Sequence, residues 1–523
     1  MNVPAIDLLS IEGRTVKDII DLRAQEAPDA PFLIDPNNGD TFSYGELAKK
    51  VRAFARHLAA EGYRPEDAIA FALTNGPQSA LAILGLFYGG WCATSINLVA
   101  GRDVIGYVLE HSEAKLIIAQ EATAATVADA QAAVGLAVPV KMLTSTLFEL
   151  EGGAPETGGA PNLQDDALLM YTSGTTGRPK GVVLTQANLL AGGSATALAH
   201  NLQNDDRAMC VLPLYHINGL IVTVMAPLSS GGSVVMPEKF SVSTFWPIIR
   251  HNNCSWFSVV PTQISYLLHA EPAEDDEISD KLRFGRSASA PLAPEVQRAF
   301  EKRFGVPIIE TMGLTETAAQ ILSNPLPPAQ RKIGSPGIAF GNEVIIADTA
   351  QREVERGEEG EVLVRGPNVM KHYLKNEIAT RESITLEGWL RTGDLGRMDP
   401  QGYVFITGRL KELIIKGGEN IAPREIDEAL YTHPDIIEAA AFACPCSNYG
   451  QRVEAAVKLA AGSLLCEQEL IAVCKDRVGA FKSPDRIHIL DDLPKGPSGK
   501  IQRKKLSDMF DALHQREIYP QAK

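Results

Sequence analysis

Apolar positions in the first two thirds of the chain follow two alternating patterns. A helix is predicted over 44–58, where Ser43 and Glu46 form a capping box and apolar residues follow at spacings of three and four. The run 68–73 is short and apolar, as in a buried strand. Because such helices and runs keep alternating, the sequence predicts a mostly parallel α/β sheet.

The same alternation resumes after the polar, glycine-rich stretch 151–159 and continues to about residue 336. Over 337–409 the pattern changes to short strands with tight turns, which indicates a β-rich subdomain. The remaining residues combine strand runs with a helix near 423–431. We therefore expect an α/β fold in which a large N-terminal body of two α/β subdomains and a β-rich subdomain precedes a small α+β C-terminal domain. Buried strands are predicted at 182–184, 209–212, 233–236, 257–260 and 307–310, and further strands at 361–365, 403–408, 438–442 and 454–459.

Length and charge narrow the classes of function. A chain of 523 residues exceeds what one core supports, so at least two domains are expected. A net charge of −15 argues against a nucleic-acid or anionic-membrane partner, because phosphate binding rests on clustered Lys and Arg. The N-terminus has no signal-peptide pattern, and the most apolar stretch, 80–88, is too short to span a membrane. A cytoplasmic protein that acts on a small molecule is expected, and a homodimer stays open.

The strongest single feature is the glycine-rich segment TSGTTGRPKG at 172–181. It suits a polyphosphate, because glycines let backbone amides approach, hydroxyls donate and Lys180 supplies a positive charge. A Walker A loop needs Gly-Lys followed by Ser or Thr, whereas Pro179 precedes Lys180 and Gly181 follows it. The segment instead resembles the signature loop of the adenylate-forming superfamily, which includes acyl-CoA synthetases, peptide-synthetase adenylation domains and beetle luciferases.

Further motifs of that superfamily follow in the same order. GLTET at 313–317 resembles the segment whose Thr and Glu, here Thr315 and Glu316, hold Mg²⁺ beside the ATP phosphates. RTGD, ending at Asp394, resembles the motif whose Asp binds the ribose hydroxyls. Met312 stands where most relatives carry an aromatic residue that stacks on adenine. The resemblance therefore implies ATP, Mg²⁺ and coenzyme A as cofactors.

The segment GRLKE at 408–412 resembles the hinge of the superfamily, in which Arg409 reaches the nucleotide and Lys411 is the pivot. This resemblance places the N-terminal domain at 1–408, the hinge at 409–411 and a mobile C-terminal domain at 412–523.

The C-terminal domain carries two further segments of the pattern. The turn Gly417-Gly418 resembles the loop that rotation brings to the pantetheine tunnel. Lys500 matches the lysine that contacts the carboxylate and the α-phosphate during adenylation, and His216 matches a position beside the carboxylate and the thiol path. We thus expect Lys500, His216 and Glu316 to be catalytic, with Glu316 also the metal ligand. The nucleotide and coenzyme A residues implied are Thr172, Ser173, Gly174, Thr175, Thr176, Lys180, Met312, Thr315, Asp394, Arg409, Gly417 and Gly418.

The wording RSASAPLAP at 286–294 is close to the oxalate-CoA ligase branch, which implies a very small polar acid. Arg286 and the hydroxyls of Ser287 and Ser289 are candidate partners of that acid, although Arg286 equally suits a structural role at a strand end. Where the oxalate enzymes place a His, this chain has Ala318-Ala319-Gln320, so a small neutral, hydroxy- or sulfo-substituted acid stays open. The full set of expected acid-binding residues is His216, Arg286, Ser287, Ala288, Ser289 and Thr311.

The function implied is an AMP-forming acid–thiol ligase that adenylates a small polar carboxylic acid and transfers the acyl group to coenzyme A. The same adenylation chemistry could load a carrier-protein arm, or activate a larger aryl or medium-chain acid. A luciferase-like oxidase would share the motifs, but a compact polar pocket suits it poorly. A regulator without catalysis would not need Lys500 and Glu316.

Overall fold

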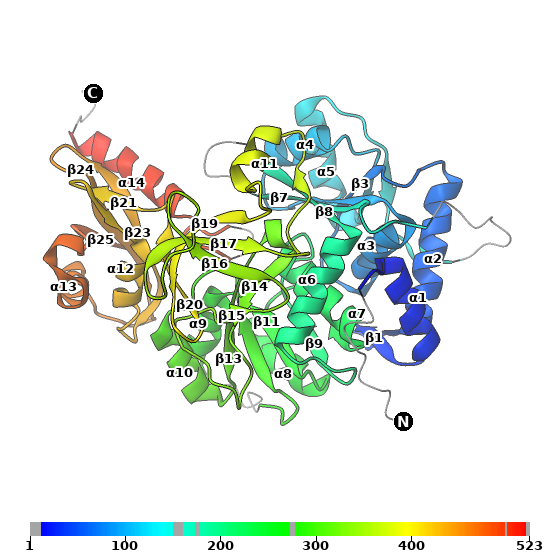
Figure 1. Cartoon of the computed structure of the whole chain (residues 1–523), viewed down its shortest axis with the longest axis horizontal. Helices are drawn as coiled ribbons and strands as arrows, with labels where there is room; N and C mark the ends of the chain where they lie inside the picture. The colour runs from blue at the N-terminus through cyan, green and yellow to red at the C-terminus, as the bar shows by residue number, and fades with distance from the viewer. Residues whose placement is uncertain (1–11, 150–159, 173–177, 272–277, 497–498, 519–523) are drawn as a thin grey trace.

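The computed structural model describes residues 12–149, 160–172, 178–271, 278–496 and 499–518. A large body holds the N-terminal elements, and a smaller domain with the last strands and helices stands at one end of the molecule (Figure 1). The helices are α1 (Val16–Glu26), α2 (Tyr44–Ala60), α3 (Pro77–Gly89), α4 (Arg102–His111), α5 (Glu121–Val134), η2 (Ser145–Phe148), α6 (Gln186–Ala199), η3 (Asn218–Met225), α7 (Ala226–Ser230), α8 (Val242–His251), α9 (Pro261–His269), α10 (Pro294–Phe304), η4 (Thr315–Thr317), α11 (Glu377–Ser383), α12 (Pro423–Leu430), α13 (Glu467–Lys482) and α14 (Arg503–Ile518).

The strands alternate with these helices over the first two thirds of the chain. They are β1 (Pro31–Ile34), β2 (Thr41–Ser43), β3 (Ala68–Ala72), β4 (Cys92–Ser95), β5 (Leu116–Ala119), β6 (Val140–Met142), β7 (Asp166–Thr172), β8 (Lys180–Thr185), β9 (Arg207–Cys210), β10 (Ser233–Val235), β11 (Trp256–Val259), β12 (Phe284–Ser287), β13 (Ile308–Leu314), β14 (Ala319–Ser323), β15 (Ile338–Ala339), β16 (Glu343–Ala347), β17 (Glu359–Arg365), β18 (His372–Tyr373), β19 (Leu390–Met398), β20 (Val404–Arg409), β21 (Ile414–Lys416), β22 (Glu419–Ile421), β23 (Ile436–Cys446), β24 (Gly450–Leu459) and β25 (Arg486–Ile489).

Two sheets with parallel centres form the large body. In the described part of the chain one has the order β15-β14-β13-β12-β11-β9-β10-β1-β2, parallel from β13 to β1 and antiparallel at both edges. The other has the order β18-β8-β7-β4-β3-β5-β6, parallel from β7 to β6. The predicted mostly parallel α/β arrangement is confirmed.

The main hydrophobic core lies between these sheets. Helix α6 packs against β7 and β8 of one sheet and against β14 of the other, and α3 is buried along nearly its whole length, as expected of a helix that is apolar on all sides. The predicted capping box at Ser43 and Glu46 is confirmed at the start of α2, and Thr185 starts α6 in the same way. Local sequence therefore sets where the buried helices begin.

The β-rich subdomain and the small domain follow in chain order. Strands β16, β17, β19 and β20 form an antiparallel sheet, which confirms the β-rich region expected over 337–409. The small domain has the order β22-β21-β24-β23, with β25 beside β24, and its own core. The predicted α+β character of this domain is confirmed.

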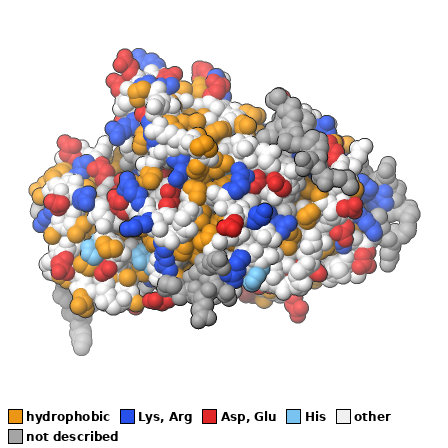
Figure 2. Space-filling model, turned by 90° about the horizontal axis from the view of Figure 1, so that it is seen from below, with side chains coloured by type: hydrophobic (Ala, Val, Ile, Leu, Met, Phe, Trp, Pro, Cys, Tyr) orange, Lys and Arg blue, Asp and Glu red, His pale blue; other side chains and the backbone are white. Residues whose placement is uncertain are grey.

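The distribution of charge on the surface and the composition of the helices bear on whether the protein binds a charged partner or crosses a membrane. On the face shown in Figure 2, Lys and Arg side chains lie interspersed with Asp and Glu side chains over both domains. None of the helices in the described ranges combines the length and the apolar composition that a membrane crossing requires.

Candidate active site

Four of the predicted segments lie where parallel strands of the nine-stranded sheet end. Residues 211–219, 260–262, 288–290 and 315–317 follow β9, β11, β12 and β13 directly. Ligands of open α/β sheets bind beyond the carboxyl ends of such strands. Strand β13 runs further than the predicted 307–310, so that Thr311 and Met312 lie within it.

The glycine-rich segment joins two antiparallel strands, β7 and β8, and Thr172 pairs with Lys180 across them. The residues between, Ser173, Gly174, Thr175 and Thr176, lie outside the described residues. The Lys180 ammonium lies 4.0 Å from the centre of the Tyr373 ring. Burial lowers the pKa of Lys180, and the negative charge of Glu316 opposes that shift.

Glu316 lies beside this lysine. The Tyr373 hydroxyl donates a hydrogen bond of 2.8 Å to Oε1 of Glu316, and burial together with that carboxylate raises the pKa of Tyr373. Thr315 precedes Glu316 in η4. Tyr373 therefore joins the predicted cation and the predicted carboxylate, and no motif in the sequence had pointed to it.

Asp394 and Arg409 face each other across β19 and β20. Nε of Arg409 donates to Oδ1 of Asp394 at 2.6 Å. Burial raises the pKa of Asp394 even though Arg409 opposes this. A buried carboxylate with acceptor capacity beyond one arginine can receive hydroxyl donors of a ligand.

Lys500 comes from the small domain and lies near this pair. Its ammonium is 3.8 Å from Oε1 of Glu412, the residue after the predicted pivot Lys411. Desolvation and the positive charge of Arg409 lower the pKa of Lys500, while Glu412 and Asp394 oppose the shift. The structure thus brings Lys500, Asp394 and Arg409 together, from two domains and three separate motifs.

The predicted loop at Gly417-Gly418 lies elsewhere. Both glycines are exposed and have φ of 61° and 89° in the turn between β21 and β22, a backbone region that favours glycine. The Gly417 amide donates to the carbonyl of Tyr449, also in the small domain. In this domain orientation Lys500, rather than this turn, approaches Asp394.

Arg286 lies in β12 with its side chain buried against η3. One guanidinium nitrogen donates to Oδ1 of Asn218 at 2.9 Å and to Oγ of Ser258 at 3.2 Å, and Nε has no hydrogen-bond partner within the described ranges. No carboxylate among the described residues forms an ion pair with it, and burial lowers its pKa to about 9. Asn218 also donates to Oγ of Ser289 at 3.3 Å. The result is a buried cation whose hydrogen-bond partners within the described residues are neutral groups.

His216 lies two residues before Asn218 in the turn that leads into η3. Its Nε2 is buried and has no hydrogen-bond partner in the part of the chain that the structure describes. Burial lowers the pKa of His216 to about 4, so the imidazole is neutral near pH 7. The neutral Nε2 can therefore donate a hydrogen bond to a ligand or accept one from it.

Other predicted acid-binding residues divide between two faces of the sheet. Ser287 follows Arg286 in β12, and successive side chains of a strand point to opposite faces. The Ser287 hydroxyl is buried and finds no hydrogen-bond partner among the residues described, whereas Thr311 donates to the Ser287 carbonyl at 3.2 Å. Ala288 is buried just after the strand, and Met312 packs against the main core. The structure therefore does not group Ser287 with Arg286.

The segment that departs from the oxalate branch is buried. Ala318 and Ala319 have φ of 45° and 85°. The side-chain amide of Gln320 donates to the Ala195 carbonyl at 3.3 Å. These side chains contribute packing and a structural hydrogen bond at the start of β14.

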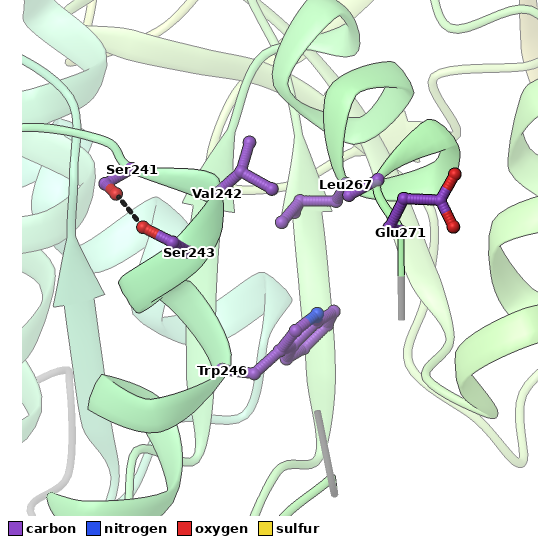
Figure 3. Close-up of a pocket in the computed structure, with 7 residues that line it drawn as sticks. Ser241, Val242, Ser243, Trp246, Leu267 and Glu271 are labelled. Carbon is purple, nitrogen blue, oxygen red and sulfur yellow. Dashed lines mark hydrogen bonds between the residues drawn. The ribbon is translucent and has the colours of Figure 1, made fainter. Parts of the chain in front are cut away.

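Two grooves of the described surface lie near α9. One of about 480 Å³ is lined by Leu212, Pro213 and Tyr215, next to His216, and by Gly496 and Gly499 of the loop that carries Lys500. The other, of about 390 Å³, lies between the start of α8 and the end of α9, over Trp246 (Figure 3). Its lining holds none of the predicted site residues.

Comparison with known families and proteins gives matches along most of the chain. Residues 20–374 match the family model described as AMP-binding enzyme, and residues 425–500 match the AMP-binding enzyme C-terminal domain. A sulfoacetate–CoA ligase of Cupriavidus necator is 45% identical over 498 residues, 94% of this chain and 97% of the relative. An oxalate–CoA ligase of Arabidopsis thaliana is 35% identical over 476 residues, 88% of this chain and 91% of the relative.

Solved structures match over similar lengths. ATP-bound MatB from Rhodopseudomonas palustris superposes with a TM-score of 0.86 at 27% identity, covering 96% of this chain and 100% of that one. The o-succinylbenzoate CoA synthetase of Bacillus subtilis, in complex with its acyl-adenylate intermediate, gives a TM-score of 0.83 at 30% identity, with coverage of 94% and 98%.

Proposed function

Because this chain belongs to the AMP-binding enzyme family and is an AMP-forming carboxylate–CoA ligase, we propose that its acid is small and carries a second anionic group. The observation that carries this proposal is the buried Arg286, whose described partners Asn218 and Ser258 are neutral. Burying a cation without a counter-charge is costly. A sulfonate or a second carboxylate on the substrate would supply that counter-charge.

The place of Arg286 supports an acid of two or three carbons. Asn218 links the guanidinium to Ser289 and lies two residues from His216, so the distal anion and the reacting carboxylate would sit close together. The relative from Cupriavidus necator is named for sulfoacetate, a two-carbon acid with a sulfonate. Sulfoacetate is therefore the first acid to test.

For the adenylation step, positioning and charge neutralisation are what the protein must supply, because the acid attacks the α-phosphate of ATP in line and expels pyrophosphate. Lys180 would neutralise the outer phosphates, Asp394 would accept the ribose hydroxyls, and Lys500 would stabilise the charge that develops at the α-phosphate. Glu316 would hold Mg²⁺ together with the phosphates, since Mg²⁺ binds through one or two carboxylates and phosphate oxygens, and the ion would offset phosphate charge. Thr315 and Arg409 would support these contacts.

For the thioester step, the groove beside His216 offers a path for the coenzyme A thiol. It is bounded on one side by Gly496 and Gly499, in the loop of the small domain that carries Lys500. Rotation of the small domain at Lys411 would withdraw Lys500 and this loop, and would bring the Gly417-Gly418 turn to the site. Neutral His216 would then face the thiol path without repelling or attracting the adenylate charge.

Pyrophosphate release over a panel of acids from two to twelve carbons, with and without coenzyme A, tests the proposal. Short acids with a second anion should give ATP-dependent release, and coenzyme A should be consumed in equal amount. A panel in which only aryl or medium-chain acids react would contradict the acid assignment. Turnover without coenzyme A would instead favour a carrier-protein arm or an oxidase.

A further inference from the structure

One face of α9 carries four polar residues that all reach the small domain. Thr262, Ser265, Tyr266 and His269 are spaced at three, one and three residues, which places them on the same side of the helix. Thr262 donates to the carbonyl of Gly499 at 3.2 Å. Helix α9 thus touches the residue next to Lys500.

The other three members contact the start of β23. Ser265 donates to the Ile437 carbonyl at 2.6 Å, and Nε2 of His269 lies 3.1 Å from the Pro434 carbonyl. Tyr266 donates to Oε1 of Glu438 at 2.5 Å. This polar face of α9 therefore binds the small domain mainly through backbone carbonyls. Tyr266 is the residue of the four that binds a charged side chain, the carboxylate of Glu438.

Glu438 is fully buried at this interface, with a side-chain exposure of 0%. Its Oε2 lies 2.9 Å from the ammonium of Lys495, which also contacts Asp492 at 2.7 Å. The ammonium groups of Lys458 and Lys495 lie 5.4 Å and 5.9 Å from the centre of the Tyr266 ring. Burial and the bond to Glu438 raise the pKa of Tyr266, so the phenol stays protonated and donates.

We propose that Tyr266 and Glu438 form a latch that holds the small domain in the orientation for adenylation. The inference rests on the proposed function, in which that domain must rotate between two steps. Lys495 and Asp492 belong to the small domain and move with Glu438, whereas Tyr266 stays with the large body. Glu438 therefore keeps its ion pair with Lys495 after rotation, and release breaks one charge-assisted hydrogen bond without leaving a buried carboxylate unpaired. Tyr266 is a positioning residue that acts through Lys500.

The test compares the two half-reactions in the full-length Tyr266→Phe variant, with sulfoacetate as the acid. Exchange of pyrophosphate into ATP should fall about 10-fold, the value of one hydrogen bond to a charged group. Thioester formation from supplied sulfoacetyl adenylate and coenzyme A should be unchanged or faster. Tyr63→Phe, which alters a half-buried tyrosine of the large body, should change neither rate. Equal loss of both rates in Tyr266→Phe, or no change in either, would overturn the latch.

A second readout needs no substrate. Amide hydrogen exchange over 434–438 should be faster in Tyr266→Phe than in the wild type, because the small domain leaves α9 more often. Unchanged exchange would contradict the latch. If no acid supports exchange in the wild type, the proposed function fails, and the hydrogen-exchange result still decides the latch.

Discussion

The nucleotide side and the acid side of the site treat charge differently. On the nucleotide side two cations face a carboxylate of the protein: Arg409 binds Asp394 at 2.6 Å, and Lys500 lies 3.8 Å from Glu412. On the acid side Arg286 is buried and, among the described residues, donates hydrogen bonds only to Asn218 and Ser258. Carboxylates of the protein thus pair with two cations on the nucleotide side before a ligand binds, whereas none of the described residues forms an ion pair with Arg286 on the acid side.

This difference indicates which side of the site determines the specificity for the acid. All members of the family must bind the same nucleotide. The side chains of its site can therefore form ion pairs and take up their positions before the nucleotide binds. The acid differs between relatives, and an unpaired buried cation selects strongly for an anionic acid, because a neutral one would leave the charge uncompensated. The following variants test each side, from the largest expected effect to the smallest.

Replacing Lys500 should give the largest loss. Lys500→Ala should slow adenylate formation about 100- to 1,000-fold, the range for removing one stabilising group from the transition state, while thioester formation from supplied acyl adenylate persists. The half-reactions are measured separately by pyrophosphate exchange and by coenzyme A consumption. Lys504→Ala, an exposed lysine nearby on α14, serves as control. Equal loss of both half-reactions in Lys500→Ala would count against two domain orientations.

Breaking the pair on the nucleotide side should weaken ATP binding. Asp394→Asn removes the carboxylate that accepts the ribose hydroxyls and leaves Arg409 unpaired, so the KM for ATP should rise about 10- to 100-fold. The KM for the acid should change little. Asp399→Asn, in the turn that joins the same two strands, is the matched control. An unchanged KM for ATP would remove Asp394 from the nucleotide site.

Two arginines of the same region separate recognition from stability. Arg286→Met should raise the KM for sulfoacetate about 10-fold without lowering the melting temperature, because it removes a buried charge that has no counter-charge. Arg283 lies 2.5 Å from the buried carboxylate of Asp206, so Arg283→Met should lower the melting temperature and leave that KM unchanged. A lower melting temperature with an unchanged KM in Arg286→Met would make Arg286 a structural arginine.

His216 should not change its protonation state near neutral pH, so it should add no inflection to the pH profile of kcat/KM there. Its pKa of about 4 lies below the ordinary value of about 6.5, so the folded protein keeps the ring neutral from pH 5.5 to 8. The pH profiles of kcat/KM for the wild type and His216→Asn should therefore be parallel over that range. An inflection near pH 6.5 that only the wild type shows would contradict this.

Sequence motifs point to the nucleotide-side residues more directly than to the acid-side residues. Lys180, Glu316, Asp394 and Lys500 stand in short motifs whose order identifies them, and the fold places the last two beside Arg409. The environment of Arg286 depends on the register of β11 and β12 and on how η3 packs, which no local pattern specifies. Ser287 was grouped with Arg286 in the sequence, yet strand alternation directs it to the other face.

Contacts between residues far apart along the chain were the least predictable from the sequence. Tyr373 lies in a two-residue strand that no periodicity indicates, and it meets Glu316 only through tertiary packing. The polar face of α9 could have been found in the sequence, because Thr262, Ser265, Tyr266 and His269 recur at helical spacing. That spacing could not show that the face meets another domain, because β23 is more than 160 residues away along the chain.

The most direct test of a missing negative charge is the wild-type kcat/KM for two acids of nearly equal shape. Sulfoacetate carries a sulfonate, and methylsulfonylacetate replaces its charged oxygen with a methyl group. Sulfoacetate should be preferred about 100-fold or more, because the neutral acid leaves Arg286 unpaired. Equal values for the two acids, or a preference for the neutral one, would contradict the account.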